Sequence, residues 1–117
     1  MLEVLNAKGT LPKSYPVPVQ VIHLGDTLTM VTIGGEVVVD YSLQFKKQFG
    51  ARTWVTSYAN DVMAYIPTFR VLQEGGYEGH TSMAVYGLPA DRWKPNVEEL
   101  VNAAAKKLVE ETKVKGE

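Results

Sequence analysis

Cysteine is missing altogether from this 117-residue chain. Its absence excludes disulfide bridges and thiolate-ligated metal centres, so stability has to come from a packed core. Long apolar runs are missing too: no stretch approaches the ~18 residues of a membrane span, and we expect no transmembrane segment. Residues 1–14 also lack the basic start and apolar centre of a signal peptide.

A surplus of charge of either sign is lacking as well. The 12 basic and 13 acidic side chains leave a formal net charge of −1, which offers no electrostatic attraction to nucleic acid. We therefore expect no nucleic-acid partner. The hydrophobic fraction of 45% is ordinary for a globular protein, and the length suits one domain.

Several short catalytic and ligand-binding motifs are also absent. The sequence contains no GxxxxGK[ST], GxGxxG or GxSxG, so phosphate-loop, dinucleotide-binding and serine-hydrolase functions have no local support. The two histidines, His23 and His80, lie far apart and show no metal-binding spacing. We expect a structural role for His23, which falls within a strand pattern, and leave the role of His80 open.

What is present predicts an α/β fold: a small mixed sheet with an antiparallel hairpin, a βαβ crossover and a long C-terminal helix. We expect a single α/β domain over residues 17–113, after an extended lead-in at 1–16 and before a tail at 114–117. The expected elements are strands at 17–24, 28–33 and 53–58, helices at 36–49 and 68–74, and a final helix opening at Asn96.

The order of these elements predicts the sheet topology. Gly25-Asp26 is a turn signal between the first two strands, which should form a hairpin. A strand, a helix and a strand in succession predict a parallel crossover. The segment at 59–95 is the least regular, and a connection of that length in a small domain is more often functional than idle.

The two longer helices carry apolar stripes. Val38, Tyr41, Phe45 and Phe49 recur at helical spacing, and Gly50 is placed to end their helix. For the final helix we expect a capping box formed by Asn96 and Glu99. Its expected buried stripe consists of Val97, Leu100, Val101, Ala104, Leu108 and Val109.

Glu36 and three tyrosines are the candidate chemical groups. Glu36 follows two glycines after a strand, in the expected first helical turn, where the helix dipole favours an ionised carboxylate. Tyr58, Tyr65 and Tyr77 lie along an irregular region, and phenols can stabilise an oxyanion or bind a metal. The alternative is that these residues have no chemical role. Glu36 would then simply occupy an exposed position at a helix N-terminus, and the tyrosines would pack between the core and the solvent.

Taken in order, the segments resemble the neutral/alkaline non-lysosomal ceramidase family. The resemblance covers residues 17–112 and is carried by VQVIHLGD at 19–26, GE at 35–36, SYAN at 57–60, YIPT at 65–68, EGGYE at 74–78 and the terminal helix. It implies a zinc amidohydrolase that hydrolyses the N-acyl amide of ceramide and holds zinc by two histidines, a glutamate and a tyrosine. On this resemblance Glu36 and Tyr65 are zinc ligands, and Tyr77 stabilises the tetrahedral intermediate.

The resemblance covers only the C-terminal part of the catalytic domain. The family's zinc histidines, catalytic histidine and substrate-contacting arginine lie upstream of the matching region, so we expect the isolated chain to be inactive. The expected partner is the missing N-terminal half of the domain or a second copy, and the expected substrate of the parent is a lipid-like N-acyl amide. The resemblance also makes a secreted or periplasmic parent an expectation.

Two alternatives stay open. The chain could be a non-enzymatic α/β binding or assembly module, such as a homo-oligomer, or a stand-alone hydrolase built on His80, Glu36 and a tyrosine. Convergence of Glu36, Tyr65 and Tyr77 would favour the amidohydrolase over the module, because an interaction module has no reason to bring these three side chains together.

Overall fold

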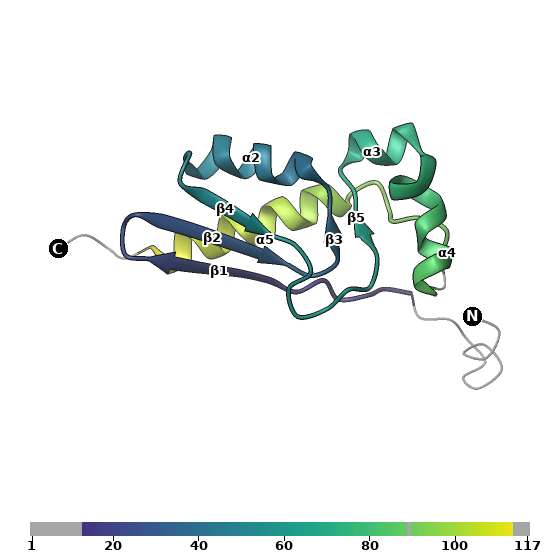
Figure 1. Ribbon diagram of the computed structural model, residues 1–117, viewed down its shortest axis with the longest axis horizontal. Coiled ribbons are helices and arrows are strands. Elements are labelled where there is room, and N and C mark those ends of the chain that lie inside the picture. Colours follow the sequence, from purple (N-terminus) through teal and green to yellow (C-terminus); the bar gives the residue numbers. More distant parts are fainter. Residues whose placement is uncertain (1–12, 89, 114–117) are drawn as a thin grey trace.

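The computed structural model describes residues 13–88 and 90–113. They form an α/β fold with a three-stranded mixed sheet, a separate two-stranded sheet and a long C-terminal helix (Figure 1). This is the fold class that the sequence predicts. Most of the expected lead-in at 1–16 and all of the expected tail at 114–117 lie outside the described residues.

The three-stranded sheet has the order β1-β2-β4. β1 (Val19–Leu24) and β2 (Leu28–Ile33) pair antiparallel, and the turn between them uses Gly25 at φ 61°. β4 (Thr53–Thr56) pairs parallel with β2. Both the hairpin and the parallel neighbour are therefore confirmed.

The start of the first long helix corrects the sequence prediction. Residues 36 and 37 form a short strand, β3 (Glu36–Val37), and α2 (Val39–Phe49) begins only afterwards. Residues 36 and 37 are extended because they pair in parallel with another short strand, β5 (Tyr65–Ile66), in the separate two-stranded sheet. The backbone amide of Glu36 donates to the Ala64 carbonyl at 2.8 Å, so it is bonded across the sheet. Glu36 is thus not in a helical turn.

The region expected to be irregular contains three short helical elements. α3 (Phe69–Glu74) lies where a short helix is predicted, and it is followed by a π-helical turn, η1 (Tyr77–Thr81), and by α4 (Ser82–Tyr86). Figure 1 shows α3 and α4 beside β5, at the opposite end of the molecule from the β1–β2 turn.

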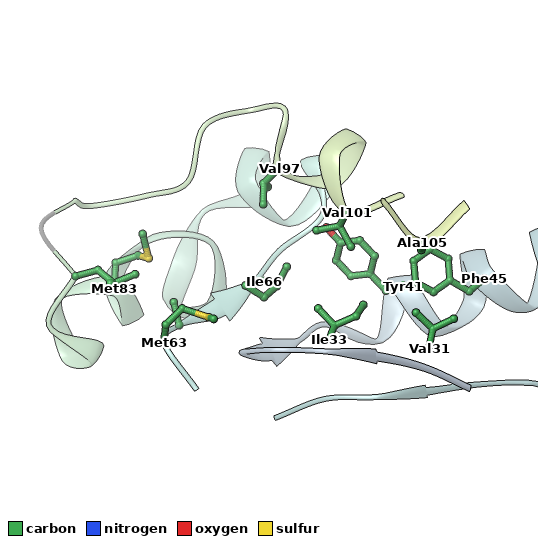
Figure 2. Close-up of a cluster of buried hydrophobic side chains, with 12 residues drawn as sticks. Val31, Ile33, Tyr41, Phe45, Met63, Ile66, Met83, Val97, Val101 and Ala105 are labelled. Carbon is green, nitrogen blue, oxygen red and sulfur yellow. The ribbon is translucent and has the colours of Figure 1, made fainter. Parts of the chain in front are cut away.

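The core lies between one face of the three-stranded sheet and two helices. The final helix, α5 (Val97–Thr112), packs on β1, and α2 packs on β4. Figure 2 shows Val31 and Ile33 projecting from β2 toward side chains of both helices. The facing helix residues in this cluster are Tyr41, Phe45, Val101 and Ala105. The stripe expected on α2 is confirmed.

Two expectations for α5 are wrong. The capping box does not form: Asn96 makes no side-chain cap hydrogen bond, and at φ −89° and ψ 9° it lies outside the extended conformation that capping side chains favour. Leu100 is 62% exposed. The expected stripe is confirmed at Val97, Val101 and Val109, which are buried together with Ala105, so the buried face repeats every fourth residue. Among the described residues, none of the helices combines the length and apolarity needed to span a bilayer.

Candidate functional site

Glu36 and Tyr65 are direct neighbours across the small sheet. β3 and β5 pair in parallel with Glu36 opposite Tyr65. Side chains opposite each other in paired strands point to the same face. Two of the three residues selected from the sequence therefore meet because their strands pair, although they are far apart along the chain.

Two features of the backbone bring β3 this close to β5. Gly35 has φ +80°, and a Cβ at this position would lie 2.7 Å from the carbonyl oxygen of Ala64 and 2.8 Å from Cγ1 of Ile66. Only glycine allows that approach. The Ser57 hydroxyl then accepts a hydrogen bond from the Val37 amide at 2.7 Å and donates one to the Gly35 carbonyl at 3.0 Å. The Ser57 hydroxyl therefore fixes the backbone at the residues before and after Glu36.

The residues after Ser57 adopt an unusual conformation beside the site. Tyr58 and Asn60 have φ values of 60° and 69°, in the left-handed region that non-glycine residues seldom occupy. The Tyr58 amide donates to the Gly35 carbonyl at 2.8 Å. Such conformations persist when the surrounding structure determines them, and they concentrate at functional sites.

Tyrosine hydroxyls surround the Glu36 carboxylate. Tyr86 donates a hydrogen bond to Oε2 of Glu36 at 2.8 Å, and the hydroxyls of Tyr58 and Tyr65 also lower the pKa of this carboxylate. The Tyr65 ring meets Tyr77 edge-on with a centroid separation of 5.6 Å, and it meets Tyr86 edge-on at 6.2 Å. We call Glu36 and these four tyrosines the Glu36 cluster.

Within the cluster, the pKa of Glu36 is lowered and the pKa values of Tyr58, Tyr65 and Tyr86 are raised. Hydrogen bonding from Tyr58, followed by that from Tyr86 and Tyr65, lowers the pKa of Glu36 despite an opposing effect of desolvation. The same hydrogen bonds to Glu36 are the main cause that raises the pKa of Tyr58, Tyr65 and Tyr86 to about 12. Near neutral pH, one carboxylate is therefore surrounded by protonated phenols.

A pocket of about 320 Å³ opens beside this cluster. Glu36, Tyr58 and Tyr65 line it together with apolar side chains of residues 37–39, and Arg70 also reaches it. Arg70 is held by Asp40, whose two carboxylate oxygens accept bonds of 2.9 Å from the guanidinium. The pocket thus combines an apolar wall, an ionised carboxylate and phenol donors.

Tyr77 is positioned by η1, which packs tightly on α3. A Cβ on Gly79 would lie 2.5 Å from the carbonyl oxygen of Val71, so glycine is needed for this contact. The Tyr77 side chain remains about half exposed next to Tyr65. π-helical turns are rare and often occur at functional sites.

The histidines do not join this group. His23 lies between the hydroxyls of Thr29 and Thr112, at 3.1 and 2.9 Å, which is a structural arrangement linking β1, β2 and α5. Nε2 of His80 lies 3.3 Å from a carboxylate oxygen of Asp91. Within residues 13–88 and 90–113, no group of three or more His, Cys, Asp or Glu residues could hold a metal ion.

Glu36 and Tyr65 do not make a zinc site by themselves within the described residues. The Glu36 carboxylate and the Tyr65 phenol provide two neighbouring oxygen donors. Zinc usually takes four ligands with nitrogen or sulfur among them, and the described part of the chain brings no histidine to this pair.

One member of the cluster was not selected from the sequence. Tyr86 lies in α4, beyond the last segment of the family resemblance before the terminal helix. The available signal was composition, because four of the six tyrosines fall between positions 58 and 86.

Comparisons with known proteins add no assignment. Neither a scan against protein-family models nor searches of curated proteins and of solved structures gives a match to this chain.

Proposed function

We propose that this chain is the C-terminal part of the catalytic domain of a zinc amidohydrolase similar to the neutral ceramidases. The observation that supports this function is the convergence of Glu36, Tyr65 and Tyr77. They come from β3, β5 and η1: Glu36 and Tyr65 are paired and line the pocket, and the Tyr77 ring meets Tyr65 edge-on. Packing alone does not require that three tyrosines act on one carboxylate while a fourth packs on the ring of one of them.

Each side chain has a role consistent with amide hydrolysis. Glu36 is ionised and its Oε2 is held by Tyr86, as a carboxylate ligand is commonly held by an outer hydrogen bond. Tyr65 would be the second ligand from this chain, and Tyr77 would donate a hydrogen bond to the developing oxyanion. When bound, zinc lowers the pKa of a water molecule and polarises the amide carbonyl.

The remaining zinc ligands would come from another polypeptide segment. The proposed partner is the missing N-terminal half of the catalytic domain, and the proposed substrate of the complete enzyme is a lipid-like N-acyl amide. With two ligands the chain alone should bind zinc weakly and should not hydrolyse such an amide.

Zinc titration monitored by ultraviolet difference absorption tests the ligand assignment. Binding to Tyr65 replaces its hydroxyl proton, so zinc should produce the absorption of an ionised phenol in the wild-type chain. Tyr65→Phe should abolish this signal and Glu36→Gln should weaken it. Tyr15→Phe is the matched control, because the Tyr15 hydroxyl bonds to Asp61 instead. An equal signal in wild type and Tyr65→Phe would contradict the assignment.

An N-acyl amide hydrolysis assay with added zinc separates this proposal from a stand-alone hydrolase. We expect no turnover by the isolated chain. Turnover that is lost in Glu36→Ala would instead show that a complete site forms without an upstream half.

A further inference from the structure

The three-stranded sheet has a second face, opposite the core. Strand residues alternate between faces, and Val19, Val21, Val31, Ile33 and Val55 all belong to the core side. The intervening side chains point the other way. This outer face consists of Gln20, Ile22, Leu24, Leu28, Met30, Thr32, Trp54 and Thr56.

An apolar row crosses the middle of this outer face. Ile22 lies opposite Met30 in the antiparallel pair, and Met30 lies opposite Trp54 in the parallel pair. Trp54 is 58% exposed and Ile22 is 45% exposed, and the neighbouring Leu24 is 55% exposed. The row therefore spans all three strands and is open to solvent.

In the part of the chain that the structure describes, both helices that pack on this sheet lie on its core side. α2 and α5 meet there, and Figure 2 shows Val31 and Ile33 of β2 directed toward them. Sheets with antiparallel pairing can leave one face in water, but that face then usually carries polar side chains. An exposed apolar row on such a sheet indicates a surface that is covered in the working assembly.

We propose that this outer face is an interface between two copies of the chain, which pack sheet to sheet about a two-fold axis. None of its eight side chains carries a charge, so apposing the face to an identical one creates no like-charge repulsion. A two-fold contact requires this kind of self-complementarity. Tryptophan and methionine are also among the residues enriched at interfaces. The inference does not rest on the proposed function.

The size of the face sets the expected strength of the dimer. Two strands of six residues and one of four, spaced ~5 Å apart, cover a few hundred Å², which is less than the ~800 Å² per partner of a standard interface. We therefore expect a reversible dimer whose population rises with protein concentration.

Sedimentation equilibrium over a wide concentration range tests this interface. The wild-type chain should pass from monomer to dimer. Trp54→Glu should weaken dimerisation roughly 30-fold or more, as expected for the loss of a central aromatic anchor. Leu43→Glu is the matched control: Leu43 is 62% exposed on α2, on the other side of the sheet, and its replacement should leave the dissociation constant unchanged.

A second variant guards against a folding defect in the first. Ile22→Lys places a charge in the same row on the edge strand, and it should weaken the dimer while circular dichroism stays that of the wild type. A monomer at every concentration, or a dimer that only Leu43→Glu disrupts, would overturn the proposal. A monomer whose Trp54 fluorescence becomes shielded only on addition of an upstream-encoded polypeptide would also overturn it and would assign the face to that polypeptide.

Discussion

At the residue scale, three tyrosine hydroxyls lower the pKa of a single carboxylate, that of Glu36. The contribution of each hydroxyl to this pKa can be measured separately. Tyr58 has the largest effect on the pKa of Glu36, ahead of Tyr86 and Tyr65. The sequence predicts an ionised Glu36 on the ground of a helix dipole. The cause in the structure is hydrogen bonding by side chains that only the folded chain brings together.

Removing one donor should raise the pKa of Glu36. We expect a rise in both Tyr58→Phe and Tyr86→Phe, with the larger rise in Tyr58→Phe, because each variant loses a hydrogen bond to the charged form. The carboxyl carbon shift of Glu36, followed by NMR against pH, measures this. Tyr77→Phe is the control, since Tyr77 contacts Tyr65 and is not among the donors to Glu36. An unchanged Glu36 pKa in both donor variants would refute this account of the cluster.

Asp40 should make folding stability depend on pH. Hydrogen bonds from Arg70, and then from Thr68, lower its pKa below the ordinary value of 3.8. The folded state thus keeps Asp40 ionised where the unfolded state binds a proton. The stabilisation is complete above pH 3.8 and is lost as pH falls through the folded-state pKa.

Urea denaturation of wild type and Asp40→Asn at a series of pH values checks this. The wild type should be the more stable at neutral pH, and the difference should shrink as the solution is acidified past the ordinary aspartate pKa. A difference that stays constant over the whole acid range would show that Asp40 does not provide this linkage.

At the scale of elements, hydrophobic periodicity and turn residues were enough for the larger parts of the fold. The hairpin at Gly25, the parallel return to β4 and the buried stripe of α2 all follow from local patterns. The β3–β5 pair could not be predicted in this way. Each of these strands has two residues, which is too short for alternation to show, and their pairing depends on contacts between distant segments.

Within the β3–β5 pair, substitution of Gly35 should cause the largest loss in the free energy of unfolding. Gly35→Ala adds a Cβ that meets the Ala64 carbonyl and Ile66 at a residue with φ +80°, so we expect a loss of about 2–4 kcal/mol in the free energy of unfolding. Gly25→Ala is the control, since Gly25 has a similar φ of +61° with nothing within 4 Å, and it should cost about 1 kcal/mol.

Chemical denaturation gives both values. Equal losses in the two variants would mean that the close approach of β3 to β5 is not tight enough to require glycine. A larger loss in Gly35→Ala, accompanied by a changed environment of Tyr65, would link the glycine directly to the geometry of the Glu36 cluster.

At the scale of the whole molecule, two features support the two proposals. The proposed zinc ligands Glu36 and Tyr65 belong to no metal-binding group within the described residues, which is why further ligands from an upstream segment are proposed. One face of the sheet exposes an apolar row, which is why a dimer interface is proposed there. In the sequence, the residues alone make Glu36 and the tyrosines candidates, and the resemblance to the ceramidase family implies roles for Glu36, Tyr65 and Tyr77. The sequence could not indicate that Tyr86 joins them, because α4 has no periodic pattern of its own and its place is set by packing at η1.

The most direct test of the central claim is to sequence the DNA immediately upstream of the Met1 codon in the native gene. We predict that the reading frame continues upstream and encodes two histidine-containing motifs, which would provide the remaining zinc ligands to the site formed by Glu36 and Tyr65. A stop codon in frame close to Met1 would contradict this. Glu36 and the tyrosines would then belong to a protein without a complete zinc site, and the assembly role of the outer sheet face would become the better explanation.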